Sequence, residues 1–297
     1  MSFSAEVKTE LCRAMPSVSC CARAELYGVF LCCHTFTARE IRIITENEDF
    51  ARRLPKLLKK AFDMEFDRLP SEEEHKFIFH ITEEKKLTEI INSFGFDPHQ
   101  SSVLHINFGL LEEECCRSAF LRGVFLSGGS VTDPTRQYHL ELATSHVQAS
   151  RELQALLKDM GHRPRQVTRG GYQVTYFKTS EQIEDLLTAI GAPVKAMELM
   201  NTKMEKDLRN EVNRRVNCEA ANLDKAVDAA QEQLEAIRIL YELDRVESLP
   251  DKLKETIILR ETYPELTLAQ LAAEFDPPLT KSCLNHRLRK LIELSKQ

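Results

Sequence analysis

The hydrophobic pattern of the first two thirds of the chain switches between helical and strand periods, and it does so twice in the same order. Each half starts with an apolar helical segment and continues with strand, amphipathic helix, strand or hairpin, and helix. The segments are 20–33, 39–45, 54–62, 76–82 and 84–95 in the first half, and 115–128, 138–144, 153–161, 166–180 and 181–191 in the second. This pattern predicts an α+β domain with two pseudo-symmetric halves.

The two leading helices also share residues. CCARAELYGVFLCCHT at 20–35 aligns with CCRSAFLRGVFLSGGS at 115–130, with Gly28 matching Gly123. Small residues recur every fourth position, which places them on one helix face. Glycine within a helix destabilises it by about 0.5–1 kcal/mol relative to alanine, so another backbone must come close. We expect the two helices to pack on each other across a pseudo-twofold axis; the alternative is that each stripe faces its own sheet.

Residues 195–249 contain no glycine and carry apolar residues at helical spacing, which predicts one long amphipathic helix or two in tandem. The segment 209–222 interrupts this pattern with asparagines, which favour caps and turns, so we expect a break or bend there. Its polar residues are interpreted either as an inter-domain contact or as an auxiliary DNA contact. They are Asn210, Asn213, Arg214, Arg215 and Asn217.

Residues 250–297 form a small helical unit in which Thr267 caps LAQLAAEF, DPP makes a turn, and LTKSCLNHRLRKLIEL follows. Two short helices with a polar, basic second helix indicate a helix-turn-helix, whose second helix enters the DNA major groove. Residues 281–297 carry a net charge of 5 − 1 = +4. We assign base contacts to Lys281, Ser282, Asn285 and His286, and phosphate contacts to Arg287, Arg289 and Lys290. A helical hairpin with a solvated basic face is the alternative.

Composition limits the class of protein. The 40 Lys and Arg against 46 Asp and Glu give a net charge of −6, which excludes a uniformly cationic nucleic-acid coat but not a local basic face. No apolar run approaches the roughly 18 residues of a membrane span. The segment MSFSAEVKTELCRAM carries acids and lacks the apolar core of a signal peptide. We expect a cytoplasmic protein with no membrane contact.

The nine cysteines are an odd number, which argues against a disulfide framework. They include the adjacent pairs Cys20-Cys21, Cys32-Cys33 and Cys115-Cys116, and no C-x-x-C. Adjacent cysteines cannot both point at one tetrahedral metal without strain. We therefore expect packing roles, no metal and no cofactor. The sequence also lacks phosphate-loop, dinucleotide-binding, H-E-x-x-H and G-x-S-x-G motifs.

The repeated segments LYGVFLCCH at 26–34 and LRGVFLSGG at 121–129 resemble the LAGLIDADG motif of homing endonucleases. Over residues 20–192 the resemblance implies a pseudo-twofold αββαββα fold with the motif helices paired at its centre. In that family an acid near the end of each helix holds the divalent metals. The matching positions are Cys33 and Gly128, which supply no oxygen ligand. We expect no catalytic residue and no nuclease activity.

Acidic residues near these two positions are not expected to supply the missing metal ligands. Asp133 lies in a turn sequence, VTDPT, and Glu40 in a strand context.

The two halves differ in charge. Residues 63–80, with Glu72, Glu73 and Glu74 among their acids, have a net charge of 2 − 6 = −4, whereas residues 161–178 have a net charge of +4. A saddle that follows DNA phosphates needs both halves cationic, so a symmetric saddle is disfavoured. The turn at Arg169 is either an auxiliary phosphate contact or, the favoured interpretation, a solvated hairpin.

The degenerate domain, RNEVNRRVNCEAANLDK at 209–225 and SCLNHRLRKL at 282–291 together resemble the bacterial WhiA family across essentially the whole chain. That resemblance implies a DNA-binding regulator linked to sporulation, cell division and chromosome segregation in Gram-positive bacteria. It also implies that the C-terminal unit is similar to region 4 of sigma factors.

The expected organisation is therefore an N-terminal helix (1–19), a LAGLIDADG-like domain (20–194, with repeats 20–100 and 115–194), a helical linker (195–249) and a helix-turn-helix domain (250–297). The expected function is sequence-specific, non-enzymatic transcriptional regulation on double-stranded DNA, with a protein partner in transcription, at the nucleoid. The alternatives are a protein-interaction adaptor on an inactive endonuclease scaffold and a residual Mg²⁺-dependent homing nuclease.

Overall fold

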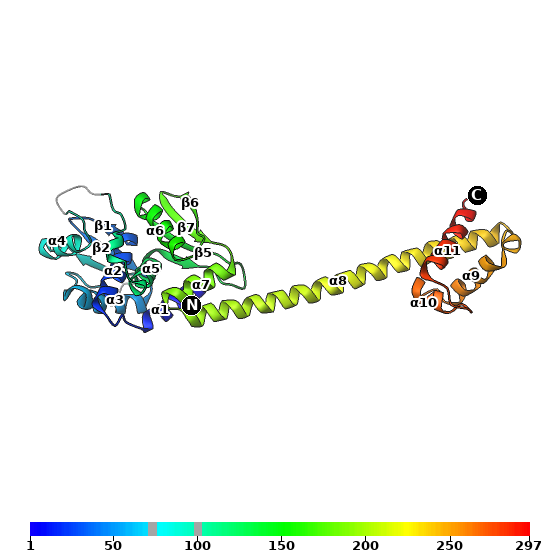
Figure 1. Cartoon of the computed structure of the whole chain (residues 1–297), viewed down its shortest axis with the longest axis horizontal. Helices are drawn as coiled ribbons and strands as arrows, with labels where there is room; N and C mark the ends of the chain where they lie inside the picture. The colour runs from blue at the N-terminus through cyan, green and yellow to red at the C-terminus, as the bar shows by residue number, and fades with distance from the viewer. Residues whose placement is uncertain (71–75, 98–102) are drawn as a thin grey trace. The chain divides into compact units, whose positions relative to one another are not determined.

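The computed structural model describes residues 1–70, 76–97 and 103–297 (Figure 1). Glu72, Glu73 and Glu74, which were counted above among the acids of the first half, lie outside the described residues. Contacts divide the chain into two compact units, Met1–Lys206 and Asp207–Gln297. Each unit has its own buried apolar cluster, and each is described by itself.

The first unit contains the two halves that the hydrophobic pattern predicts, preceded by α1 (Phe3–Arg13). The first half comprises α2 (Ser19–Cys32), β1 (Thr35–Phe36), β2 (Ile41–Thr45), α3 (Glu48–Phe62), β3 (Phe77–Ile81) and α4 (Glu84–Ser93). After the 3₁₀ turn η1 (Phe108–Leu110), the second half comprises α5 (Glu114–Gly128), β4 (Gly129–Val131), β5 (Leu140–Thr144), α6 (Val147–Asp159), β6 (Arg165–Arg169), β7 (Tyr172–Phe177) and α7 (Ser180–Ile190). The predicted α+β fold is confirmed.

Each half has one antiparallel sheet, with strand order β1-β2-β3 in the first and β4-β5-β7-β6 in the second. Alternate residues face the core, so that Ile41 and Ile43 of β2 and Leu140 and Leu142 of β5 are buried. The short strands β1 and β4, which follow the central helices, were not separated from the neighbouring segments by the sequence pattern. Strands of two or three residues are too short to show an alternation.

Helices α2 and α5 lie side by side at the centre of the first unit (Figure 1). The two glycines permit this contact: a β-carbon on Gly123 would overlap the backbone oxygen of Glu25 and lie 3.0 Å from the Val29 nitrogen. A β-carbon on Gly28 would overlap the backbone oxygen of Phe120 and lie 2.8 Å from the Val124 nitrogen. The prediction that the helices pack on each other is confirmed, and the alternative, in which these glycines face their own sheets, is wrong.

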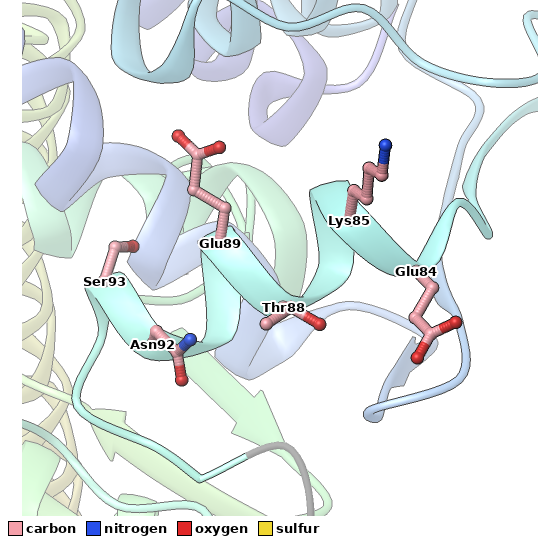
Figure 2. A pocket seen from close by; sticks show the side chains of 6 residues that line it. All are labelled: Glu84, Lys85, Thr88, Glu89, Asn92 and Ser93. Atoms are coloured by element: carbon pink, nitrogen blue, oxygen red, sulfur yellow. The ribbon is translucent and has the colours of Figure 1, made fainter.

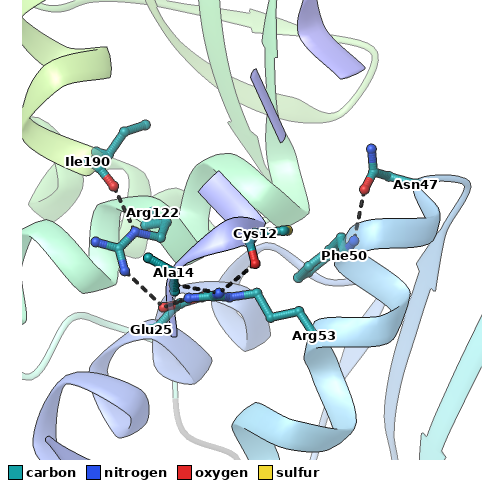
Figure 3. Close-up of polar contacts among 8 residues, drawn as sticks. All are labelled: Cys12, Ala14, Glu25, Asn47, Phe50, Arg53, Arg122 and Ile190. Carbon is teal, nitrogen blue, oxygen red and sulfur yellow. Dashed lines mark hydrogen bonds and ion pairs between the residues drawn. The ribbon is translucent and has the colours of Figure 1, made fainter. Parts of the chain in front are cut away.

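A buried ion pair ties the central helices to their surroundings (Figure 3). Glu25 of α2 accepts two hydrogen bonds from Arg53 of α3, at 2.6 and 2.8 Å, and both side chains are almost fully buried. Arg53 also donates to the Ala14 carbonyl at 2.8 Å. Arg122 of α5 lies 3.3 Å from the same carboxylate and donates to the Ile190 carbonyl at 2.7 Å. Since all these groups are paired, the buried charges are compensated.

The segment after the second half forms a single helix, α8 (Pro193–Glu242). The expected break at 209–222 is therefore wrong, because the helix continues through these residues. Asparagine lowers helix propensity by well under 1 kcal/mol. Without proline or glycine in the segment, the surrounding Glu, Arg and Ala residues maintain the helix. Its stripe of Met200, Met204, Leu208, Val212 and Val216 is exposed.

The second unit continues with η2 (Val246–Ser248), α9 (Asp251–Thr262), α10 (Leu268–Ala273) and α11 (Lys281–Ser295). Its core combines Ile237 and Leu240 of α8 with apolar residues of α9, α10 and α11 and of the turn after α10. These are Leu253, Ile257, Leu271, Phe275, Leu284, Leu288 and Leu291. Among the helices that the structure describes in either unit, none has the length and apolar character of a membrane span.

We expect Gly123→Ala to destabilise the first unit by about 3 kcal/mol or more, since the added methyl group meets rigid backbone and the helix pair must separate. Urea unfolding followed by circular dichroism measures this. Ser118→Ala on the same helix is the control and should change stability by less than about 0.5 kcal/mol. Equal stabilities of the two variants would show that the close backbone contact is not a constraint.

Candidate nucleic-acid interface

The two helices that resemble a helix-turn-helix have well-formed N-termini. Thr267 and Gln270 form a capping box at the start of α10, in which the Thr267 nitrogen donates to the Gln270 side chain at 3.0 Å. Thr280 accepts a hydrogen bond from the Cys283 nitrogen at 3.2 Å and so caps α11. The Thr267 cap that the sequence predicts is confirmed.

Helix α11 separates apolar and polar side chains on opposite faces. Leu284, Leu288 and Leu291 are buried in the core of the second unit. The opposite face presents exposed or half-buried polar residues to solvent. Lys281, Ser282, His286, Arg289 and Lys290 are exposed, and Asn285 is half-buried. One side of the helix therefore carries cationic and hydrogen-bonding groups without needing them for packing, which is the arrangement that a DNA-reading helix requires.

Arg287 differs from its neighbours, and its assignment to phosphate is corrected. Its side chain is only 14% exposed, donates to the Lys252 carbonyl at 3.2 Å and pairs with Glu255 at 3.3 Å. Its guanidinium also lies over the Phe275 ring, 5.4 Å from the ring centre. These contacts hold α11 against α9, so Arg287 supports the helix from within the unit. The i+3 spacing of Arg287 from Leu284 places it at the edge of the apolar face, which the sequence analysis did not weigh.

Arg260 of α9 is a positioning residue that the sequence analysis missed. It is 2% exposed and donates to the carbonyls of Pro264 and Leu266 at 2.9 and 2.8 Å. Burial lowers the pKa of this guanidinium. These bonds fix the turn that leads into α10. A charged residue in a helical pattern usually faces solvent, so nothing in the sequence distinguished Arg260 from an exposed arginine.

The auxiliary residues on α8 all face solvent in the structure: Asn210, Asn213, Arg214, Arg215 and Asn217 are exposed. Their role in contacting DNA stays a prediction. Arg169, at the end of β6, is exposed and pairs with Glu141 at 2.8 Å. The following Gly170 and Gly171 have φ angles of 57° and 83°, which suit a tight hairpin turn. Arg169 is thus partly neutralised by a carboxylate of β5, which lies on the other side of β7 in the sheet.

The two positions that correspond to endonuclease acids are closed to metal chemistry. Cys33 follows α2, its thiol donates to the Thr35 carbonyl at 3.1 Å, and burial raises the pKa of that thiol to about 12. At the end of α5, a β-carbon on Gly128 would overlap the Ala143 backbone oxygen and lie 3.1 Å from the Cys32 β-carbon. A carboxylate therefore cannot be introduced at Gly128 without moving backbone.

The nearby acids form other contacts. Asp133 accepts hydrogen bonds from the nitrogen and hydroxyl of Thr135, at 2.8 and 2.7 Å, and these bonds lower the pKa of its carboxyl. Glu40 lies 2.8 Å from the Nδ1 of His80. Over residues 1–70, 76–97 and 103–297, the one group of three or more His, Cys, Asp or Glu ligand atoms that are mutually close consists of cysteines, not acids.

A surface hollow beside α4 was considered as a ligand site. Its lining residues, Glu84, Lys85, Thr88, Glu89, Asn92 and Ser93, all come from that one helix (Figure 2). Figure 2 shows their side chains spread around the helix rather than directed at one point. Small-molecule sites are concave and have convergent polar groups. We therefore assign no site to this hollow.

Comparison with known proteins covers both units. Residues 117–209 match the family model of the WhiA LAGLIDADG-like domain, and residues 212–295 match that of the WhiA C-terminal HTH (helix-turn-helix) domain. The probable cell division protein WhiA of Ruminiclostridium cellulolyticum is 36% identical over 306 residues, covering 100% of this chain and 98% of that protein. Its counterpart in Alkaliphilus oremlandii is 37% identical over 310 residues, with 99% and 97% covered.

Two solved structures are also similar. Full-length WhiA from Thermatoga maritima superposes with a TM-score of 0.62 at 25% identity, covering 100% of this chain and 98% of that one. The N-terminal LAGLIDADG domain of WhiA gives a TM-score of 0.51 at 23% identity, covering 64% of this chain and 92% of that one. The second likeness concerns the fold alone.

We expect Arg287→Ala to loosen the second unit by about 1–2 kcal/mol, because an ion pair, a hydrogen bond and a cation–π contact are lost together. Hydrogen–deuterium exchange of the full chain should show faster exchange in α9 and α11. Arg289→Ala, which removes an exposed side chain from the same helix, is the control and should leave exchange unchanged. Identical exchange in both variants would contradict the structural role of Arg287.

Proposed function

The chain belongs to the WhiA family, and from this we propose that it is a sequence-specific DNA-binding transcriptional regulator without nuclease activity. Its biological role would lie in cell division and chromosome segregation and, in sporulating bacteria, in sporulation. The partner is double-stranded DNA at the nucleoid, together with a protein of the transcription machinery. The LAGLIDADG-like domain and the helix-turn-helix domain are properties of the family; the regulatory role is the proposal.

One observation carries this proposal: the outer face of α11 is cationic, and its side chains do not belong to the core of the second unit. Lys281, Ser282 and His286 lie in its first two turns and are exposed, with Asn285 half-buried beside them. In a helix-turn-helix, residues near the N-terminus of the second helix contact base edges. Asparagine can bond adenine through two atoms, and lysine can bond guanine. Arg289 and Lys290, further along, would bind phosphates and set the orientation.

The absence of hydrolysis is supported by the geometry at the ends of the central helices. Two-metal phosphodiester hydrolysis needs carboxylates that hold both ions. Cys33 offers a neutral thiol directed at a backbone carbonyl, and Gly128 has no room for a side chain. The first unit would therefore act as a scaffold, and specificity would come from the second unit. An adaptor that acts without touching DNA is the competing proposal, and the next experiment separates the two.

We expect Arg289→Glu combined with Lys290→Glu to abolish DNA retention by the full chain, because phosphate attraction becomes repulsion. The probe is a duplex taken from sites recovered by genome-wide chromatin immunoprecipitation, and the measurement is a gel shift at several salt concentrations. Replacing both residues with alanine instead should lower the slope of log affinity against log salt by about two, close to one per phosphate contact.

The matched control for this charge reversal is Arg151→Glu combined with Lys158→Glu. Both residues are exposed on α6, and the change in net charge is the same. Its DNA binding should be close to that of the unchanged chain. If the α11 variant binds as well as this control, the helix-turn-helix does not read DNA and the adaptor proposal is favoured.

We expect no nicking or cleavage when the purified full chain is incubated with supercoiled plasmid carrying a bound site and with Mg²⁺ or Mn²⁺. Gel electrophoresis of the plasmid forms measures this. A metal-dependent rise in nicked or linear plasmid that co-purifies with the chain and persists in a Cys33→Ala variant would overturn the proposal. Gly128→Asp should lower stability rather than create activity, since its β-carbon has no space.

A further inference from the structure

The N-terminal ends of the two central helices bring four cysteines together. Cys20 and Cys21 are the second and third residues of α2, and Cys115 and Cys116 hold the same positions in α5. The Sγ atoms of Cys21 and Cys116 are 3.9 Å apart. Those of Cys20, Cys21 and Cys116 all lie within 4.8 Å of one another, and the exposed Cys115 precedes Cys116 on α5. None of the four forms a disulfide.

The sequence predicts packing roles for these cysteines, because adjacent cysteines cannot both point at one tetrahedral metal without strain. In the structure the thiols of Cys20 and Cys21 nevertheless lie within 4.8 Å of each other and of the Cys116 thiol. Each helix carries two cysteines in its first turn, and the packing of α2 against α5 brings the two pairs to the same end of the helix pair. Three of the four sulfurs, those of Cys20, Cys21 and Cys116, already form one close group.

We propose that Cys20, Cys21, Cys115 and Cys116 form a structural four-thiolate site for Zn²⁺. Four sulfurs in a tetrahedral arrangement are typical of zinc, with Zn–S bonds of about 2.3 Å. Tetrahedral geometry at that bond length places sulfurs about 3.8 Å apart. The Cys21–Cys116 separation of 3.9 Å already meets this spacing. The Cys20 sulfur lies within 4.8 Å of both, and the exposed Cys115 side chain would have to rotate toward them to supply the fourth ligand.

The N-termini of the two central helices favour bound thiolates electrostatically. Zinc with four thiolates carries a net charge of −2, and the partial positive charges at the N-termini of α2 and α5 both lie at this point. Neither helix has a side-chain hydrogen bond at its N-cap, so first-turn N–H groups are free of a capping side chain and can face sulfur. A cleft of about 240 Å³, lined in part by Cys20, Arg23 and Cys116, lets an ion reach the site. Glu112 and Glu113 on its rim would attract the cation.

This site is separate from the positions that held metals in the endonuclease fold. Cys33 and Gly128 lie at the opposite ends of the same helices, roughly 18 Å away at 1.5 Å per residue over 12 residues. Thiolates are poor ligands for Mg²⁺, so the cysteine site implies no hydrolysis. Its role would be to fix the N-terminal ends of the central helix pair, where no glycine contact exists.

The test uses the full chain, purified without chelator and under reducing conditions. Elemental analysis should find close to one zinc per chain, and dialysis against a chelator should remove it and lower the melting temperature. Adding Co²⁺ to the zinc-free chain should produce the visible bands of tetrahedral cobalt and thiolate-to-cobalt charge transfer. Less than about 0.1 zinc per chain together with no cobalt bands would overturn the proposal.

Variants identify the ligands. Cys20→Ser combined with Cys115→Ser changes two exposed thiols, so this variant should fold normally. Its zinc content per chain should fall at least tenfold, and its cobalt form should lack the charge-transfer band. Cys218→Ser, which changes an exposed cysteine of the second unit, is the matched control and should keep full zinc. Zinc retained by the double variant would overturn the assignment. So would iron with sulfide in place of zinc, or a Cys21–Cys116 disulfide without metal in mass spectra of the freshly purified chain.

Discussion

The close contact of α2 and α5 at Gly28 and Gly123 is the constraint on which the rest of the first unit depends. With no β-carbon on either glycine, each helix lies directly against the backbone of the other. This contact sets the separation of the helices along their whole length. At one end it brings the thiols of Cys20, Cys21 and Cys116 together, and at the other it places Gly128 against Ala143. The same helix packing therefore gathers cysteine thiols at one end and leaves no space for a side chain at position 128 at the other.

The buried ion pair reinforces this contact from outside the helix pair. Glu25 is held by Arg53 of α3 and approached by Arg122 of α5, so a single carboxylate links three helices. Removing one partner of a buried pair typically destabilises a protein by about 3–5 kcal/mol, because the remaining charge is left without compensation. Such a network is a stronger structural link than the exposed ion pairs of α3, which contribute about 1 kcal/mol or less.

Much of the fold could be predicted because the chain repeats itself. The matched segments at 20–35 and 115–130 indicated paired central helices, and the period of the hydrophobic pattern indicated most strands and helices. Two features could not be predicted because they depend on contacts between distant segments: Arg287 packs on α9, and the cysteine pairs meet only across the pseudo-twofold axis. A third, the continuous helix through the asparagines of 209–222, was missed because the small helix-propensity cost of asparagine was given too much weight. The identity of the exposed α11 residues could be predicted, whereas their DNA contacts remain proposals.

The two repeats are no longer equivalent where they touch. Glu25 in the first corresponds to Phe120 in the second, and Arg122 corresponds to Tyr27. Tyr27 packs on Phe120, with ring centres 5.5 Å apart, while Glu25 pairs with Arg122. A dimer of two first repeats would have an acid without Arg122, and a dimer of two second repeats would have Arg122 without an acid. The chain therefore pairs unlike residues across its pseudo-twofold axis, and a symmetric homodimer of either half would lack both the Glu25–Arg122 pair and the Tyr27–Phe120 contact.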